Sequence, residues 1–334
     1  MKGYKKYIFS KLFWYILTLV VAVFLNFLLP RLIPGNPVSV IVGKMAQGMK
    51  DTNSYKRLYQ TYMTQFGLDK PLWQQFFVYV GNLFHGDLGV SFGQYPRKVG
   101  DILAASLPWT IALQLPAIIV GWILGNLLGA VAAYIKGVFD KGVFPVFLFL
   151  SCIPAFAFAI IFVWLFAMTL HIAPASGGYE FSMIPNLSFS FFVSVLQHYQ
   201  LPFWSNVLVM IGGQSLGMRE MSIYELNADY VKYSRLLGIR NHRIVKYVFK
   251  NAMLPQITGL ALSLGTMVGG ALITEIVFSY PGIGYAMFSA ITSQDFPLIS
   301  GCTLIISLAV LAANFIIDII YGLVDPRIKA AQQE

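Results

Sequence analysis

The sequence predicts an all-α integral membrane protein with six transmembrane helices and both termini in the cytoplasm. Three observations support this fold class. The 334-residue chain is 57% hydrophobic and only 11% charged, whereas a soluble domain carries about 25% charged residues. This is more apolar surface than a soluble fold can bury. Six segments are apolar over the length of about 20 residues that a bilayer-spanning helix needs, and most of the charges lie between them.

The first predicted helix covers 8–30, and the opening stretch MKGYKKYIFSK holds four lysines. The apolar run Ile8–Leu29 is longer than that of a signal peptide and has no small-residue cleavage site after it, so we expect it to be retained. The other predicted spans lie near 103–135, 143–170, 200–218, 253–278 and 298–324. The run Phe189–Leu196 is too short to cross a membrane, and we expect it to lie at the surface.

The basic residues give the orientation. With the N-terminus inside, the cytoplasmic pieces are 1–11, 136–142, 219–252 and 325–334, and together they hold 15 of the 23 lysines and arginines. The other eight fall in 31–98, a segment long enough to be largely exempt from the positive-inside rule. The two short outer loops near 171–199 and 279–297 hold none. Both termini are therefore predicted to be cytoplasmic.

These counts divide the chain into four parts. We expect a first transmembrane helix over 1–30, an extracytoplasmic segment over 31–98, a transmembrane core over 99–325 and a cytoplasmic tail over 326–334. The extracytoplasmic segment opens with the turn signal PGNP at 34–37 and is predicted to form short helices. Within the core, 219–255 is a charged cytoplasmic loop.

Small residues recur every four positions on two predicted spans. Gly121, Gly125 and Gly129 lie on the second span, and Gly265 and Gly269 lie on the fifth. This spacing lets helix backbones approach closely. Plain helix packing explains the pattern, although helices that slide against each other would use the same residues. Pro116, Pro145 and Pro154 are also expected within helices, where neighbouring groups must satisfy the freed carbonyls.

Two acidic residues fall in predicted spans. Glu275 lies near the outer end of the fifth span and Asp318 near the inner end of the sixth. Intramembrane carboxylates are costly, so they line a pathway or pair with a partner, and partial solvation near an interface is the alternative. A proton-coupled secondary carrier would place a carboxylate nearer the middle of the bilayer.

The sequence carries few motifs for chemistry. It has no P-loop, no HExxH and no CxxC, so we expect no nucleotide or metal bound by this chain. Cys152 and Cys302 lie in apolar runs and are expected to be buried thiols. Gly213–Gly217 fits GxSxG, but a nucleophile elbow needs a strand-to-helix turn and a general base. An intramembrane serine hydrolase built on Ser215 remains a remote alternative, as does a secondary carrier.

The segment 229–255 holds six lysines and arginines in a chain that is otherwise mostly apolar. Ser222 and Glu225 have the spacing of a capping box, which predicts a helix over about 223–237 that ends at Gly238 as its C′ residue. Asn241 could then cap a second helix that enters the membrane. One face of the first helix is apolar, and it comprises Leu226, Tyr230, Tyr233, Leu236 and Leu237. Such a loop could serve orientation alone, bind anionic lipid or dock a cytosolic protein.

This loop resembles the EAA loop of ABC-transporter permeases, in which a glycine lies 17 residues before the proline of a closing Leu-Pro. Gly238 and Leu254-Pro255 have this spacing. The chain is most similar to the dipeptide/oligopeptide permease family, whose loop begins with Asp-Tyr-Val and closes with Asn-Ala-x-Leu-Pro. Further matching stretches follow in the family's order: PGNPV (34–38), GLDKPLWQQ (67–75), GDLGVSF (86–92), TEIVFSYPGIG (274–284) and DPRIK (325–329). The chain departs from the family at Ser234, Lys246-Tyr247 and Asn36, where alanine, Arg-His and aspartate are usual.

The resemblance implies a type I ABC importer permease in a prokaryotic inner membrane, with no catalytic residue, no cofactor of its own and no nucleic-acid partner. Its implied partners are a second homologous permease, two cytosolic ATPases that hold ATP and Mg, an extracytoplasmic solute-binding protein and membrane lipids. The residues implied in ATPase coupling are Leu226, Asp229, Tyr230, Tyr233, Ser234, Leu237, Gly238, Leu254 and Pro255.

The family transports peptides, although relatives carry oligosaccharides or nickel. Aromatic residues on the outer half of this chain could stack on sugars or anchor the protein at the membrane interface. They include Trp73, Phe76, Phe77, Tyr79, Trp204 and Tyr280.

Overall fold

The structure is a computed structural model, and it describes residues 2–32, 38–39, 42–43, 52–135, 137, 139–270 and 272–324. Over these residues the regular structure is helical, with one isolated bridge between Val90 and Lys98. The all-α prediction is therefore confirmed. The chain forms two compact units, residues 1–109 with 281–334, and residues 110–280. Most of PGNPV, all of DPRIK and the predicted tail 326–334 lie outside the described residues.

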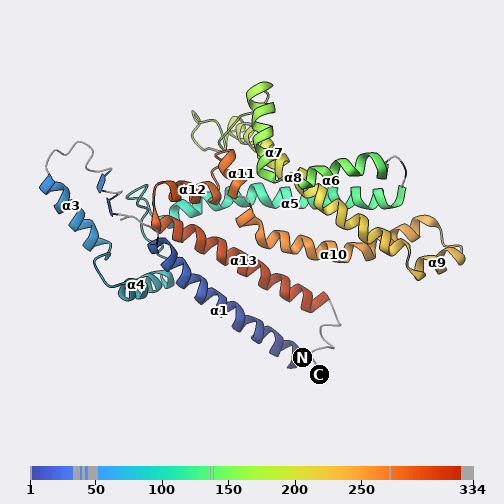
Figure 1. Cartoon of the computed structure of the whole chain (residues 1–334), viewed down its shortest axis with the longest axis horizontal. Helices are drawn as coiled ribbons and strands as arrows, with labels where there is room; N and C mark the ends of the chain where they lie inside the picture. Colours follow the sequence, from blue (N-terminus) through green and yellow to red (C-terminus); the bar gives the residue numbers. More distant parts are fainter. Residues whose placement is uncertain are drawn as a thin grey trace. The chain divides into compact units, whose positions relative to one another are not determined.

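The first unit is built on an antiparallel pair of long apolar helices, α1 (Lys2–Leu32) and α13 (Phe296–Val324), which run side by side in Figure 1. Asp318 of α13 accepts hydrogen bonds from Lys11 Nζ at 2.9 Å and Tyr15 Oη at 2.8 Å. Toward the other end, Asn26 Nδ2 donates to the Ser300 carbonyl at 2.7 Å. The contacts of Asp318 pair the first half of α1 with the second half of α13. The N-terminal end of α1 and the C-terminal end of α13 therefore lie on the same side.

The other helices described in the first unit are the short helices α3 (Thr52–Gln65), α4 (Leu72–Phe84) and α12 (Ile283–Thr292), together with the start of the long helix α5 (Val99–Ile135). Asp295, which is 1% exposed, ties the loop after α4 to the start of α13. Its carboxylate accepts from Ser91 Oγ, from the backbone N–H of Phe92 at 3.0 Å and from that of Gly93 at 2.8 Å. The Leu298 N–H also donates to it, at 3.3 Å. These bonds offset the cost of burying the charge.

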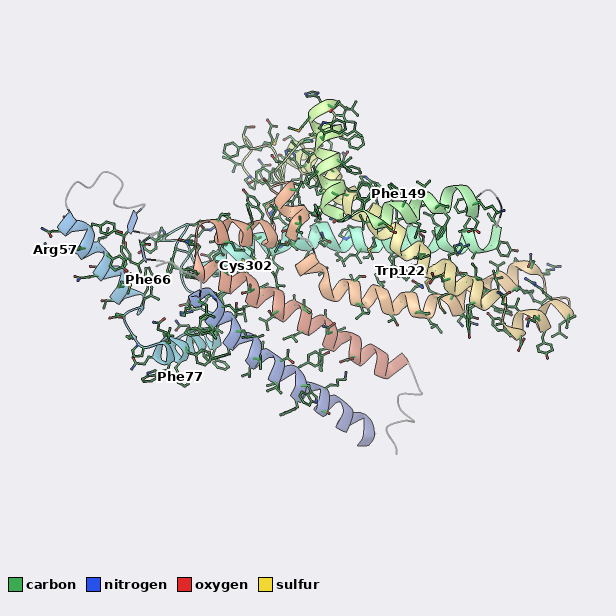
Figure 2. The ribbon with its side chains drawn as sticks, in the orientation of Figure 1. Arg57, Phe66, Phe77, Trp122, Phe149 and Cys302 are labelled. Atoms are coloured by element: carbon green, nitrogen blue, oxygen red, sulfur yellow. The ribbon has the colours of Figure 1, made fainter. Side chains whose placement is uncertain are left out.

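The second unit holds the remainder of α5 and eight further segments, with these bounds: η1 (Phe139–Val143), α6 (Phe144–Cys152), α7 (Ala155–Phe162), η2 (Val163–Thr169), α8 (Phe189–Leu226), α9 (Asp229–Leu236), α10 (Asn241–Gly270) and α11 (Leu272–Val277). The long helices α5, α8 and α10 form its frame (Figure 1). Trp122 of α5, labelled in Figure 2, donates its indole N–H to the Gln256 carbonyl of α10 at 2.9 Å.

The predicted third span, 143–170, is not one straight helix. The segments Phe139–Cys152 and Ala155–Thr169 meet at an angle of 98°. The bend lies at Pro154, which has φ −59° and ψ 144° and precedes α7 as its N-cap. Pro154 is therefore at a helix boundary, which corrects its predicted place within a helix, because proline cannot donate the N–H that a continuous helix needs.

The fourth and fifth predicted spans also differ. Phe189–Leu196 is the beginning of the 38-residue α8, with Ser188 Oγ accepting from the Phe191 N–H, and its side chains Phe189, Phe192 and Leu196 are exposed as expected. The predicted fifth span holds the second half of α10 and the short helix α11, and residue 271 between them lies outside the described residues. Within the described residues, three helices are long and apolar enough to cross a membrane, or four with the bent pair counted as one span. The helices α8 and α10 are not among these, and both bury polar side chains inside the unit, such as Ser205, Ser215 and Gln256.

Candidate functional site

The charged loop forms a helical corner, here called the α9 corner and defined as residues 225–255, at the end of α8 and the start of α10 (Figure 1). The predicted single helix over 223–237 is wrong. Instead, α8 continues to Leu226, Asn227 caps it, and α9 begins at Asp229. The predicted capping box does not form, because Ser222 is buried within α8.

Glu225 explains this difference. Its carboxylate accepts from Tyr230 Oη at 2.6 Å and from Asn251 Nδ2 at 3.3 Å. One side chain at the end of α8 therefore links α9 and α10, and the carboxylate is not available to cap a backbone N–H. Asn251 is 26 positions away in the sequence, so local spacing alone could not reveal this use of Glu225.

Gly238 ends α9 in the way the sequence predicts. Its φ is +69°, a left-handed conformation that glycine adopts without steric cost. The Gly238 N–H donates to the Arg235 carbonyl and the Ile239 N–H to the Ser234 carbonyl, each at 3.0 Å. These two bonds form a Schellman motif, which satisfies carbonyls at the end of α9. Ser234, where the family usually has alanine, contributes one of those carbonyls through its backbone.

One side of α9 packs within the chain. Val231 of α9 forms a buried cluster with Ile244 and Val248 of α10, and Leu226 and Tyr230 pack against it. Burial, and next the hydrogen bond to Glu225, raise the pKa of Tyr230 to about 12. The phenol is therefore a neutral donor at any physiological pH. These contacts fix the angle of α9 against α10.

The other side of α9 is exposed, and beside its charged residues Lys232 and Arg235 it carries three large apolar side chains. Tyr233 is 66% exposed, Leu236 82% and Leu237 78%. Large apolar side chains that are exposed together in this way mark interaction sites. The predicted apolar face is thus divided, because Leu226 and Tyr230 are used inside the chain while Tyr233 and Leu237 point outward.

The remaining predicted coupling residues lie outside this patch. Asp229 pairs with Lys232 on the exposed surface at 2.9 Å. Asn241 begins α10, but its Nδ2 donates to Tyr134 Oη. Leu254 and Pro255 are exposed further along α10, which continues through the proline.

An ion pair next to the corner was not predicted. Arg219 of α8 donates to both carboxylate oxygens of Asp140 in η1, at 2.6 and 3.0 Å. This bidentate geometry raises the pKa of Arg219 through the hydrogen bond to Asp140. The sequence signal was available, since two opposite charges flank two predicted spans at the same membrane face.

The glycines of α5 lie against α8. A Cβ on Gly121 would come within 2.8 Å of Met210 Cβ, one on Gly125 within 2.6 Å of Gln214 Cβ, and one on Gly129 within 2.2 Å of the Ser215 carbonyl oxygen. Backbones this close require glycine at all three positions. On α10, Gly265 is buried and Gly269 is exposed.

The two membrane carboxylates both have polar neighbours. Glu275 of α11 is fully buried and accepts from Thr110 Oγ1 of α5 at 2.7 Å. Asp318 pairs with Lys11 and Tyr15, as described above. Asp318 thus joins two helices of the first unit, and Glu275 joins two helices of the second.

Ser215 does not lie at a nucleophile elbow. It is buried within α8, where its Oγ donates to the Gly212 carbonyl at 2.8 Å. A strand-to-helix turn is missing from this part of the described chain. No group of three or more histidine, cysteine or acidic residues that could hold a metal ion occurs among the described residues. Of the two cysteines, Cys302 is buried, whereas Cys152 is exposed, contrary to the expectation for it.

Comparison with known proteins adds an independent finding. Residues 125–330 match the family model described as the inner membrane component of binding-protein-dependent transport systems. A di/tripeptide transport system permease protein of Pseudomonas aeruginosa is 33% identical, over 91% of this chain and 93% of its own length. A probable D,D-dipeptide transport system permease protein of Escherichia coli is 30% identical, over 91% and 92%. A dipeptide transport system permease protein of Lactococcus lactis is 29% identical, over 97% and 99%.

Proposed function

The chain belongs to the family of inner membrane components of binding-protein-dependent transport systems, and on this basis we propose that it is the transmembrane permease subunit of an ATP-driven peptide importer. The observation that carries the proposal is this similarity along nearly the whole chain to permeases of dipeptide and tripeptide transport systems. Peptides are therefore preferred to oligosaccharides or nickel as the cargo.

The chain works with partner subunits. A second permease completes the translocation pathway, a solute-binding protein delivers the cargo, and two cytosolic ATPases bind ATP and Mg. The sequence itself has no P-loop, so this chain binds no nucleotide through such a motif. It makes and breaks no covalent bond in the cargo, and its role is to change shape around it.

The α9 corner connects this chain to an ATPase. The exposed end of α9, formed by Tyr233, Leu236 and Leu237, fits an apolar cleft on a cytosolic partner. The buried side, formed by Val231 with Ile244 and Val248, joins α9 firmly to α10. Movement of the ATPase would therefore be transmitted to α10 as the transporter passes between two arrangements.

The proposed topology has six spans with both termini in the cytoplasm. The antiparallel pairing of α1 and α13 supports it, because it brings the N-terminal end of one and the C-terminal end of the other to the same side. The basic residues of 1–11 and 219–252 are consistent with a cytoplasmic location for this side and for the α9 corner. The extracytoplasmic segment 31–98, the core 99–325 and the tail 326–334 follow from this arrangement.

Cargo-stimulated ATP hydrolysis tests the proposed cargo. The assembled complex would be purified with its binding protein, and ATPase activity would be measured with dipeptides, tripeptides, short glycans and nickel. We expect stimulation by the peptides alone. Stimulation by a glycan or by nickel, with none by peptides, would keep the transporter class and overturn the cargo. A chain that purifies without any ATPase partner would contradict the class itself.

A further inference from the structure

The helix α4 has an apolar face that the proposed transport function leaves without a role. Over the described residues 52–98, all the exposed large apolar side chains belong to α4: Leu72, Trp73, Phe77, Val78 and Phe84. Trp73, Phe77 and Phe84 are spaced by four and seven residues, so they lie on one side of the helix. They are 62%, 67% and 88% exposed. The preceding helix α3 exposes no such side chain.

The adjacent face of α4 is attached to α1. Phe76 packs edge-to-face on Phe24 and Phe27, with ring centroids 5.8 and 5.2 Å apart, and Tyr79 lies 5.5 Å from Phe27. Arg31 Nε donates to Gln75 Oε1 at 3.2 Å. All of these α1 residues lie in its last third, so α4 is held at the C-terminal end of the helix.

The depth of this attachment can be estimated. The apolar part of α1, Ser10–Leu32, has 23 residues, which corresponds to about 34 Å of helix against a hydrocarbon core of about 30 Å. Its last residues therefore reach the headgroup boundary. The Arg31 guanidinium lies 3.7 Å over the Phe27 ring, one turn back along α1, and it donates to the Phe27 carbonyl at 2.8 Å.

The exposed face of α4 continues an apolar surface of α1. At the same level α1 exposes Phe24, Leu25, Leu29 and Leu32, which belong to a helix apolar enough to span the membrane. Phe76, which contacts Phe24, also lies edge-to-face on Phe77 at 5.9 Å. An uninterrupted set of apolar side chains thus leads from the lipid-facing surface of α1 to the exposed face of α4.

We infer that α4 is an interfacial helix and that Trp73, Phe77 and Phe84 insert among the acyl chains of the leaflet at the C-terminal end of α1. Amphipathic helices with aromatic side chains on the apolar face lie in this way, about 5–10 Å into the headgroup and acyl boundary. The preceding Lys70 is exposed and suits the phosphate groups above. The outer aromatics thus divide: Phe76 and Tyr79 hold α1, while Trp73 and Phe77 meet lipid and do not stack on sugars.

Spin-label accessibility tests this inference. The assembled transporter, without its binding protein, would be placed in vesicles of phosphatidylethanolamine and phosphatidylglycerol. In a Cys152→Ser background, which leaves only the buried Cys302, labels would be attached at Phe77→Cys, at Phe84→Cys and, as a matched control, at Gln60→Cys on the exposed side of α3. Power saturation would measure the accessibility of each label to oxygen, which is apolar, and to a water-soluble nickel complex.

We expect the labels at 77 and 84 to be more accessible to oxygen than to nickel, and the label at 60 to show the reverse. Addition of the solute-binding protein should leave the values at 77 and 84 unchanged. Higher nickel than oxygen accessibility at both positions would overturn the inference. If nickel accessibility is high at first and is lost only when the solute-binding protein is added, the face of α4 contacts the solute-binding protein and not lipid. Neither outcome would alter the assignment of the chain as a permease.

Discussion

At the scale of single residues, Gly238 has the most demanding position in the α9 corner. Its φ of +69° directs two backbone N–H groups onto the Arg235 and Ser234 carbonyls. A Cβ at this position would meet no atom within 4 Å. The requirement for glycine is therefore a requirement of backbone conformation, not of space, and this distinction makes a clean experiment possible.

Replacing Gly238 by valine should uncouple ATP hydrolysis from transport. A left-handed conformation costs an ordinary L-residue about 1–2 kcal/mol, and a β-branched side chain adds to this cost. The turn would open and α9 would lose its fixed angle. The measurement is cargo-stimulated ATPase activity of the assembled complex, which we expect to fall severalfold.

Gly238→Asn is the matched control, because asparagine adopts the left-handed conformation readily. It should retain most of the stimulation. Full stimulation in the valine variant would show that the turn is not part of coupling. Equal loss in both variants would show that coupling needs a position without a side chain, and not the left-handed backbone conformation.

At the scale of elements, the frame of the second unit depends on the contact between α5 and α8. The three glycines of α5 bring its backbone against Met210, Gln214 and Ser215 of α8. Gly212 of α8 makes a similar approach to α6, where a Cβ would come within 2.3 Å of Ser151 Cβ. Helices in lipid associate largely through such close packing, so small additions here should be costly.

Gly129→Ala should destabilise the chain. The added Cβ would lie 2.2 Å from the Ser215 carbonyl oxygen, and backbone cannot yield as a flexible side chain can. Overpacking of this kind costs about 1–3 kcal/mol. The midpoint of thermal unfolding of the purified complex in detergent should fall by several degrees. Gly213→Ala on α8, where a Cβ meets no atom within 4 Å, should leave it nearly unchanged, and an equal fall in both variants would refute the packing argument.

The sequence predicts elements best where the environment is uniform. The helices α1, α5 and α13 could be predicted from their long apolar runs, because the length of such a run is enough to identify a span. The break at Asn227 was not visible, since Ser222 and Glu225 also fit a capping box, and only the distant partner Asn251 decides between the two. Asp295 is a similar case, because its partners at 91–93 lie about two hundred positions earlier. The turn at Gly238 was predictable because its requirement is local.

At the scale of the whole molecule, the proposal places this chain in a membrane with its α9 corner facing a cytosolic partner. The lysines and arginines of 219–252, seven in number, suit the cytoplasmic side. The exposed apolar end of α9 then lies where an ATPase can reach it. This arrangement requires an even number of spans between the two termini.

Reporter fusions test this topology. Fluorescent protein fused after residue 334 or inserted after Gly238 should fluoresce, because both positions are proposed to be cytoplasmic. Alkaline phosphatase inserted near Gly67, in the segment proposed to be outside, should be active. An active phosphatase at the C-terminus would contradict six spans with both ends inside.

The central claim is that this chain forms part of the path by which a peptide is driven inward by ATP. The most direct measurement is uptake of a labelled dipeptide into proteoliposomes that hold both permeases, both ATPases and the binding protein. We expect uptake that requires ATP, is lost when this chain is left out, and is strongly reduced by Gly238→Val. Undiminished uptake without this chain, or dipeptide movement through this chain alone without ATP, would contradict the account.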